Sequence, residues 1–371
     1  MATALGIISY TDSSIYVRGL SKFRPVAAYS YVGRYRLVDI PISNMANSGI
    51  DNIDVYTNGD PKVLFDHVGS ARHYNINNKH GHVGVIPVFA DGERVEYITD
   101  LESYYKNLYN IMEDPNPYVV MAPVNFVFKQ NFADLLNEHI NSGADVTALY
   151  YDIDNADEVM RNVNAFEINR QHGVKSVYKN QCTDKNAHIS LETFVMSKKI
   201  FKEIVTKGHE FSSLYWFMDM LNVMASDLDI RAVEYTSPVF PIYDYNSYYT
   251  ANMNMLNEEN MSFFNNHNWP IYTRTNDSPP TIYQDGGSAQ GALISNGCVI
   301  KGKVSNSIIG RNVVIEEGAI VADSLILPGV KIGPDSLVTC CIIDKDAKVI
   351  NKKELTGYIG NPLYIARREI V

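Results

Sequence analysis

The chain of 371 residues carries 32 lysines and arginines against 42 aspartates and glutamates, which gives a formal net charge of −10. This acidic balance argues against a nucleic-acid-binding protein, because such a protein needs a basic face. The contents of 46% hydrophobic and 20% charged residues are typical of a soluble globular protein. The length allows two domains, each with its own core.

Apolar runs and cysteines indicate the cellular compartment of the protein. No stretch approaches the roughly 20 apolar residues of a membrane-spanning helix, so we expect no membrane association. The first apolar run, 4–8, is short and lacks a basic flank, unlike a signal peptide. The four cysteines show no C-x-x-C spacing and are expected to be reduced thiols. We therefore predict a cytoplasmic protein.

Short apolar strands alternate with helical segments in the first part of the chain. The runs NIDVYT (52–57), YVVMAP (118–123) and VTALYYDI (146–153) are typical of buried strands. Between the last two, Asn131 is a candidate helix N-cap and Gly143 a helix stop. The apolar face of this helix is predicted to hold Phe132, Leu135, Leu136 and Ile140. This order predicts a right-handed crossover in a mostly parallel, doubly wound, Rossmann-like α/β domain.

The period of the apolar residues changes after about residue 290. Branched apolar residues then recur every six positions, with one step of five: Ile309, Ile315, Val321, Leu327, Ile332 and Val338. This hexapeptide pattern predicts a left-handed parallel β-helix in which three hexads complete one coil and the repeat residues point inward. The alternative, a β-sandwich, would need alternating polarity and hairpin turns.

We predict three parts of the chain. An α/β domain spans 1–256, a linker rich in Asn, Pro and Gly spans 257–290, and the β-helix spans 291–371. Trp269 and Tyr272 are expected to pin the linker to one domain. The β-helix array is short, so it needs a cap or an oligomeric partner at its open face.

Three segments resemble the glucose-1-phosphate adenylyltransferases, which make ADP-glucose for glycogen. They are GRYRLVDIPISNMANSGIDNI (33–53), YYTANMNML (248–256) and WPIYTRTNDSPPTIY (269–283), and the resemblance covers nearly the whole chain. It implies that 1–256 is a nucleotidyltransferase-like domain. The competing class, the hexapeptide acyltransferases, generally needs a histidine on or near the β-helix, and no histidine follows His267.

The family's phosphate-binding motifs are altered in this chain. A glycine-rich first loop holds the ATP phosphates in the family, because only glycine lets the backbone approach that closely. Here Tyr10 and Thr11 replace the paired glycines, and no glycine follows the first strand until Gly19. We expect Tyr10 to fill the pocket. The family's Lys-Pro becomes Arg24-Pro25, so Arg24 is a predicted remnant of the substrate pocket.

The family's acidic and basic site residues also depart. By resemblance, the aspartate that holds Mg²⁺ is replaced by the neutral Asn125, and a second aspartate corresponds loosely to Asp244. The nearest counterpart of the lysine that meets the sugar phosphate is Lys179. Since Mg²⁺ is normally anchored by carboxylates and neutralises the transferred phosphates, we expect no catalytic residues, no metal site and no cofactor.

The resemblance therefore implies a non-catalytic, regulatory subunit of a bacterial glucose-1-phosphate adenylyltransferase. Its partner would be the catalytic subunit, in an allosteric hetero-tetramer. Arg34 and Arg36 flank Tyr35 and are candidates for binding a sugar-phosphate effector; in the family, the position of Arg34 carries a lysine linked to activator binding. A surface arginine paired with Asp39 is the alternative. A working enzyme with a divergent site, or a ligand-free assembly scaffold, remain alternatives for the whole chain.

Four histidines lie close together in the sequence, at positions 67, 73, 80 and 82. They allow either a metal site or a polar loop. No carboxylate that could orient a metal-bound imidazole stands out beside them, so we predict a polar loop.

Overall fold

A computed structural model describes residues 3–10, 17, 19–58, 60–69, 71–76, 81–87, 98–264, 266–284, 286–351 and 353–371. The chain forms two compact units. Unit 1 comprises Met1–Ile15, Pro25–Ala27 and Val38–Tyr243. Unit 2 comprises Tyr16–Arg24, Ala28–Leu37 and Asp244–Val371.

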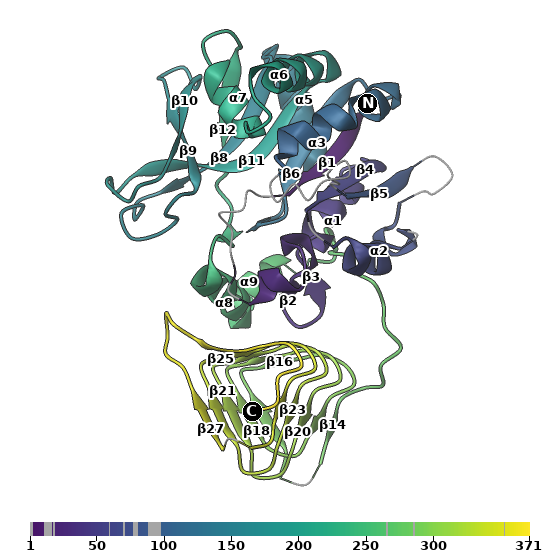
Figure 1. Ribbon diagram of the computed structural model, residues 1–371, viewed down its shortest axis with the longest axis vertical. Helices are drawn as coiled ribbons and strands as arrows, with labels where there is room; N and C mark the ends of the chain where they lie inside the picture. Colours follow the sequence, from purple (N-terminus) through teal and green to yellow (C-terminus); the bar gives the residue numbers. More distant parts are fainter. Residues whose placement is uncertain are drawn as a thin grey trace. The chain divides into compact units, whose positions relative to one another are not determined.

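Unit 1 is an α/β unit (Figure 1). Its strands are β1 (Ala4–Ser9), β4 (Asn52–Thr57), β5 (His82–Pro87), β6 (Tyr118–Pro123), β7 (Phe126–Val127), β8 (Val146–Ile153), β9 (Asn164–Ile168), β10 (Val174–Lys179), β11 (Ala187–Ser197), β12 (Ile230–Glu234) and β13 (Phe240–Pro241). Its α-helices are α1 (Asp39–Asn47), α2 (Lys62–Val68), α3 (Asp100–Lys106), α4 (Leu108–Glu113), α5 (Phe132–Ser142), α6 (Lys198–Phe211) and α7 (Phe217–Val223). The prediction of a doubly wound α/β domain is confirmed.

The main sheet has the strand order β10-β9-β11-β6-β1-β4-β5, and β8 lies between β11 and β12. The neighbours of β1 and the β8–β12 pair are parallel, whereas β11 runs antiparallel to both β6 and β8. The strands predicted at 52–57, 118–123 and 146–153 are confirmed as β4, β6 and β8. The predicted crossover does not join adjacent strands, however, because β11 is inserted between β6 and β8.

Helix α5 illustrates how local signals set an element. The Asn131 side chain accepts a hydrogen bond from the backbone of Ala133, and Gly143 ends the helix with φ of 67°, as predicted. The predicted apolar face is wrong at one position, since Ile140 is 38% exposed and His139 is buried instead. His139 completes the i, i+3, i+4, i+7 stripe that starts at Phe132, and Ile140 lies beyond its edge.

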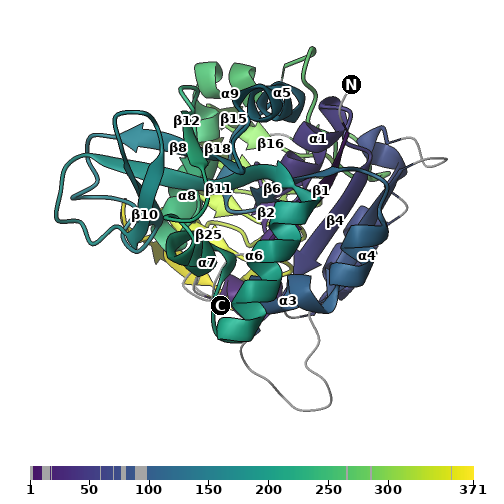
Figure 2. The same ribbon diagram turned by 90° about the horizontal axis from the view of Figure 1, so that it is seen from above.

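Helices cover both faces of the sheet (Figure 2). Side chains of α3, α6 and α7 join the strands in one apolar core that includes Leu5, Tyr104 and Phe217. On the opposite face a Cβ at Gly6 would meet Met45 of α1, so a bare glycine lets the helix pack closely. Alternation along the strands explains this division, because successive residues point to opposite faces.

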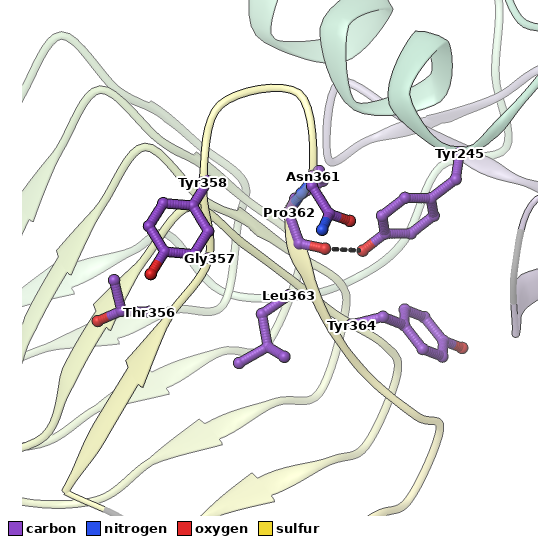
Figure 3. A pocket seen from close by; sticks show the side chains of 8 residues that line it. All are labelled: Tyr245, Thr356, Gly357, Tyr358, Asn361, Pro362, Leu363 and Tyr364. Carbon is purple, nitrogen blue, oxygen red and sulfur yellow. Dashed lines mark hydrogen bonds between the residues drawn. The ribbon is translucent and has the colours of Figure 1, made fainter.

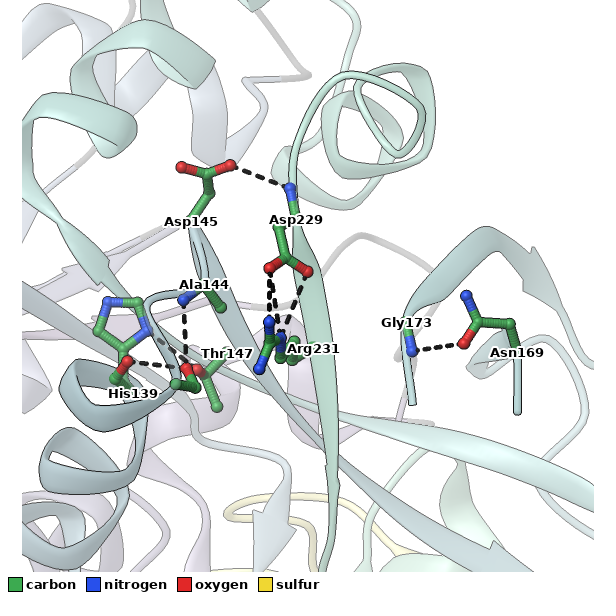
Figure 4. Close-up of polar contacts among 9 residues, drawn as sticks. His139, Ala144, Asp145, Thr147, Asn169, Gly173, Asp229 and Arg231 are labelled. Carbon is green, nitrogen blue, oxygen red and sulfur yellow. Dashed lines mark hydrogen bonds and ion pairs between the residues drawn. The ribbon is translucent and has the colours of Figure 1, made fainter. Parts of the chain in front are cut away.

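A polar network closes the start of β8 and β12 (Figure 4). His139 Nδ1 lies 2.9 Å from Thr147 Oγ1, and Asp145 accepts a hydrogen bond from the backbone N–H of Asp229 at 2.9 Å. Arg231 reaches the carboxylate of Asp229 at 3.1 Å. These contacts satisfy polar groups where α5 meets the sheet, which gives them a structural role.

Unit 2 contains a parallel β-helix (Figure 1). Outside the β-helix it holds β2 (Ser30–Tyr31), β3 (Tyr35–Arg36), α8 (Tyr245–Met253) and α9 (Glu258–Phe264). The β-helix strands are β14 (Ile282–Tyr283), β15 (Ser288–Gln290), β16 (Leu293–Ile294), β17 (Val299–Ile300), β18 (Lys303–Ser305), β19 (Ile308–Ile309), β20 (Val314–Ile315), β21 (Ile320–Ala322), β22 (Leu325–Ile326), β23 (Lys331–Ile332), β24 (Leu337–Thr339), β25 (Cys341–Ile343), β26 (Lys348–Val349), β27 (Glu354–Thr356) and β28 (Leu363–Ile365).

These strands form three parallel sheets of five strands each, and each coil contributes one strand to every sheet. This is the arrangement of a left-handed β-helix built from hexapeptides, so the predicted fold is confirmed. The inward positions stack in register, for example Ile309 on Ile326 and Ile326 on Ile343. Their burial forms the continuous core that a single coil cannot make alone.

Two details of the predicted β-helix are wrong. Ile326 rather than Leu327 occupies the inward repeat position, so the step of five lies one repeat earlier than the sequence pattern suggested. The first coil starts at Ile282, and α9 precedes it. Part of the segment 257–290, predicted as a linker, is therefore regular structure, because strands of two or three residues give little sequence signal.

Two expectations concern the chain as a whole. All four cysteines are free thiols, as predicted. Among the residues that the structure describes, no helix is long and apolar enough to cross a membrane.

Candidate functional site

The carboxyl end of β1 is where an open α/β sheet usually binds its ligand. The chain leaves β1 for β4 on one side and returns to β6 on the other. Ligands bind at such switch points, in the crevice outside the strand ends. Ser9 pairs with Pro123 in register, so Tyr10 and Val124 leave their strands side by side.

Tyr10 is buried at this position. Its hydroxyl donates a hydrogen bond to the carbonyl of Ile98 at 2.9 Å and lies 2.9 Å from Ser103 Oγ. Its ring packs edge-on against Trp216, with the centroids 5.9 Å apart. The phenol is thus held by packing and by polar contacts, and it occupies the end of β1. Thr11, the second residue predicted in place of a glycine, lies outside the described residues.

Asn125 follows β6 at the same edge. Its backbone carbonyl accepts a hydrogen bond from Ile242 at 2.7 Å, and its side chain is buried. Within the described part of the chain, Asn125 Oδ1 has no hydrogen-bond partner. Asn125 therefore brings a neutral amide oxygen to the position where the resemblance implies an aspartate.

Two other predicted site residues belong to other elements of the chain. Lys179 is exposed at the end of the edge strand β10, and β9 and β11 separate that strand from β6. Asp244 belongs to unit 2, where its carboxylate accepts a hydrogen bond from the backbone of Ser247 at 2.7 Å and caps α8. That N-cap is a structural role.

Asp100 is a buried acid of unit 1. Its carboxylate accepts hydrogen bonds from the backbone N–H groups of Leu101 and Phe217, at 2.7 and 2.9 Å. Burial raises the pKa of Asp100 to about 7, more than these hydrogen bonds lower it. The acid therefore carries a proton for part of the time near neutral pH.

Unit 2 holds a buried ion pair between segments far apart in the sequence. Arg24 Nη2 donates to both carboxylate oxygens of Asp344 at 2.6 Å, across 320 residues of sequence. Asp344 is fully buried and also accepts a hydrogen bond from the Tyr364 hydroxyl at 2.9 Å. Gly19, with φ of 81°, leaves room for the Tyr364 ring, which a Cβ at that position would overlap.

Further basic side chains lie near this pair. Burial, followed by the charges of Arg36 and Arg24, lowers the pKa of Lys345 to about 7, and Arg367 adds to this effect. Arg24 Nη1 and Arg367 Nε are buried without a hydrogen-bond partner in the described chain. We call Arg24, Arg36, Lys345 and Arg367 the cation cluster. The unsatisfied donors of Arg24 and Arg367, with the positive charges beside them, are suited to a multiply charged anion such as a phosphate group.

The sequence pointed to part of this cluster. Arg36 was a predicted anion ligand, and Arg24 was predicted to belong to a substrate pocket. Lys345 and Arg367 were missed, because neither lies in a motif and only folding brings them to the N-terminal arginines. Charged residues in a β-helix sequence are otherwise interpreted as part of a solvent-exposed face.

Arg34 lies in a different place from Arg36. It is exposed and lines an open groove of about 320 Å³ with Tyr35, Asn276, Ser295 and Arg311. Its guanidinium lies 5.7 Å from the centre of the Tyr35 ring. The two predicted effector ligands are therefore separated, and the cation cluster is the more enclosed of the two arrangements.

The histidine segment contains a buried contact that was not predicted. Asp39 Oδ1 lies 2.7 Å from His67 Nε2 and accepts a hydrogen bond from the Tyr74 hydroxyl at 2.6 Å. His82 is paired with Asp54 at 3.3 Å, and position 80 lies outside the described residues. Across the described ranges, no group of three or more His, Cys, Asp or Glu side chains is arranged to hold a metal ion.

A second pocket of unit 2, of about 280 Å³, lies beside the last coil (Figure 3). Tyr245, Tyr358, Asn361 and Tyr364 line it, and the Tyr245 hydroxyl donates to the Pro362 carbonyl at 2.9 Å. Its lining is neutral, unlike that of the cation cluster. Tyr364 contributes to both, since its hydroxyl bonds Asp344.

Comparisons with known proteins agree with this architecture. The family described as Nucleotidyl transferase matches residues 17–159, and the GlmU-like C-terminal hexapeptide family matches residues 281–358. Glucose-1-phosphate adenylyltransferase of Bacillus mycoides is 26% identical over 331 residues, covering 88% of each chain. The enzyme of the same name from Bacillus cytotoxicus is 25% identical over 347 residues, covering 91% of this chain and 92% of its own.

The matched segments and the fold show that the chain is similar to nucleotidyltransferases in its α/β part and to hexapeptide proteins in its β-helix. Over nearly its full length it is similar to these two glucose-1-phosphate adenylyltransferases.

Proposed function

We propose that this chain is a non-catalytic, regulatory subunit of a glucose-1-phosphate adenylyltransferase, which modulates ADP-glucose synthesis in a hetero-oligomer with a catalytic subunit. The observation that carries this proposal is the Tyr10 side chain, buried at the switch point of the sheet and fixed by Ile98, Ser103 and Trp216. A nucleotide at this edge would have to displace that ring from its core contacts.

The residues near Tyr10 support an inactive site. Nucleotidyl transfer depends on positioned phosphates and on Mg²⁺ to neutralise their charge. The metal is normally anchored by carboxylates, whereas Asn125 supplies a neutral oxygen. The described residues at this edge therefore do not fit a magnesium site, and we assign no chemical step to them.

The regulatory part of the proposal rests on the cation cluster. Its unpartnered Arg24 and Arg367 nitrogens, together with the lowered pKa of Lys345, indicate a site that a bound anion would stabilise. We assign to it a phosphate-bearing effector. Its binding would shift the equilibrium between quaternary states of the hetero-oligomer and so change the substrate affinity of the catalytic subunit. Coupling of this kind typically changes affinity by about 5- to 150-fold.

Activity measurements test the catalytic half of the proposal. The purified chain, given ATP, glucose 1-phosphate and Mg²⁺, should release no ADP-glucose above background. Mixed with a catalytic subunit, it should change that subunit's KM or its response to phosphate-bearing metabolites. Turnover by the chain alone would identify a working enzyme, and unchanged kinetic constants in a stable complex would identify a scaffold.

Substitutions test the effector site. Arg36→Gln and Lys345→Gln should each reduce the effector response of the mixed oligomer by about fivefold or more. Lys331→Gln is the matched control, because Lys331 is an exposed lysine on β23 in the same β-helix. An effector response that survives both substitutions, with assembly unchanged, would remove the cation cluster from the proposal.

A further inference from the structure

The last coil of the β-helix carries an insertion at one corner. In the coil before it, β24 ends at Thr339 and β25 begins at Cys341, so a single residue makes the turn. In the last coil, β27 ends at Thr356 and β28 begins only at Leu363. The strands on both sides stay in register, since Thr356 pairs with Thr339 and Leu363 pairs with Cys341. The segment 357–362 therefore replaces a single turn residue.

Backbone contacts hold the inserted segment as an ordered turn. The Tyr358 N–H donates to the Asn361 carbonyl at 3.2 Å, and the Asn361 N–H donates to the Tyr358 carbonyl at 2.9 Å. Gly360, with φ of 86°, takes the left-handed conformation that lets the chain turn back. The turn nevertheless exposes 73% of Tyr358 and 88% of Ile359, so it adds little to the buried core. Insertions of this kind in repeat proteins often lie on the binding face.

The turn forms one wall of the pocket of about 280 Å³ beside the last coil (Figure 3). Tyr358 lies on one side and Tyr245 of α8 on the other, with Asn361 and Leu363 between them. Tyr364 completes the aromatic lining, and the described residues that line the pocket are all uncharged. Small-molecule sites usually have volumes of roughly 300–1,000 Å³, so this pocket suits a ligand of about one ring.

The aromatic rings of the pocket are fixed at right angles to each other. The rings of Tyr245 and Tyr364 are 6.2 Å apart at an interplanar angle of 89°. Their hydroxyls donate to the Pro362 carbonyl and to the Asp344 carboxylate, each at 2.9 Å. A planar aromatic ligand stacks best between parallel ring faces, and these two rings do not form such a slot. Their fixed positions mean that a ligand of another shape meets a preformed wall.

A neutral sugar ring fits these features. The C–H groups on one face of a pyranose pack against the electron-rich face of an aromatic ring, while its rim carries hydroxyl groups. The Asn361 amide and the Thr356 hydroxyl can both donate and accept hydrogen bonds, as sugar hydroxyls require. A charged ligand would lose water in this neutral pocket without gaining a counter-charge.

We propose that this pocket binds a neutral pyranose. The Tyr358 ring is the stacking platform, and Asn361 is the main hydrogen-bonding partner of the sugar hydroxyls. The pyranose is either a free sugar or the end of an oligosaccharide, which present the same ring chemistry. The site differs in charge from the cation cluster, and the proposal does not depend on the regulatory role of the chain.

Saturation-transfer difference NMR titrations of the full chain test the proposal, with glucose, maltose, mannitol and adenosine as probes. Glucose and maltose should bind with roughly millimolar dissociation constants, as expected for a ligand of this size. Mannitol has the hydroxyl groups of a sugar but no ring, and adenosine is neutral but carries a planar base. Mannitol should bind at least about tenfold more weakly than glucose, and adenosine should not displace maltose.

Substitutions locate the sugar in the pocket. Tyr358→Ala and Asn361→Ala should each weaken maltose binding by about tenfold or more. Tyr358→Phe keeps the stacking ring and should bind maltose within about threefold of wild type. Tyr283→Ala is the matched control, because Tyr283 is a 51% exposed tyrosine in the first coil of the same β-helix. It should leave maltose binding unchanged.

The outcomes separate a sugar site from unspecific binding. A wild-type chain that binds neither sugar at tens of millimolar would overturn the proposal, as would a Tyr358→Ala variant that binds as tightly as wild type. Mannitol bound as tightly as glucose, or displacement of maltose by adenosine, would overturn the assignment to a pyranose. Maltose bound more tightly than glucose identifies an oligosaccharide end as the source, and equal affinities identify a free sugar. Far-ultraviolet circular dichroism verifies folding, which exposed substitutions should not disturb.

Discussion

The buried pair of Arg24 and Asp344 allows a quantitative prediction. Arg24 is 5% exposed and Asp344 is fully buried, with nitrogen–oxygen distances of 2.6 Å. Asp344→Asn removes the one carboxylate that contacts Arg24 among the described residues and leaves the guanidinium among the other members of the cation cluster. Breaking a buried pair in this way costs about 3–5 kcal/mol of unfolding free energy, and we expect the lower end because the amide oxygen still accepts one hydrogen bond.

The same substitution should make the protein depend on anions. Without the Asp344 carboxylate, sulfate is the available counter-charge for the cation cluster. Sulfate present at 100 times its dissociation constant would restore about 2.7 kcal/mol of unfolding free energy. Wild-type protein should gain less, since its carboxylate already neutralises Arg24.

Urea unfolding with and without sodium sulfate measures both effects, and sodium chloride of equal ionic strength corrects for screening. Asp346→Asn is the matched control. Asp346 is two residues away, its side chain is 54% exposed, and its ion pair with Arg368 is long, at 4.0 Å. We expect that control to change stability by no more than about 1 kcal/mol. The reasoning is refuted if Asp344→Asn costs as little as the control, or if sulfate stabilises both variants equally.

Two further predictions concern pH. The pKa of Lys345 is lowered to about 7, so its amine is mostly neutral above pH 7 and must take up a proton when an anion binds. Sulfate affinity should therefore fall by up to about tenfold per pH unit above pH 7. Lys345→Met should abolish this slope in calorimetric titrations, and a slope that persists would point to another group. The raised pKa of Asp100 means that the folded state holds a proton which the unfolded state has lost between pH 3.8 and about 7, so stability should fall with rising pH by up to about 1.4 kcal/mol per unit. Asp100→Asn, which keeps an acceptor for Leu101 and Phe217, should flatten that part of the urea-unfolding pH profile; an unchanged profile would contradict the assignment.

Much of the fold could be predicted because short-range sequence patterns determine it. The strands at 52–57, 118–123 and 146–153, and the caps of α5 at Asn131 and Gly143, depend on neighbouring residues alone. The hexapeptide period likewise identified the β-helix, since each repeat must place one branched residue inside. The errors at Ile140 and Leu327 are displacements by one residue. A periodic pattern does not fix positions more finely than this.

Only the tertiary structure decided how these elements combine into sites. The sequence, through its resemblance, predicts that the glycine-rich loop is altered, and the structure shows that Tyr10 is buried after β1. The sequence did not indicate that Lys345, Arg367 and Asp344 join Arg24. Such groupings depend on contacts between residues as much as 320 positions apart. Local propensity depends on neighbouring residues and does not predict such contacts. The energy of burying and pairing charges arises only when the folded chain brings them together.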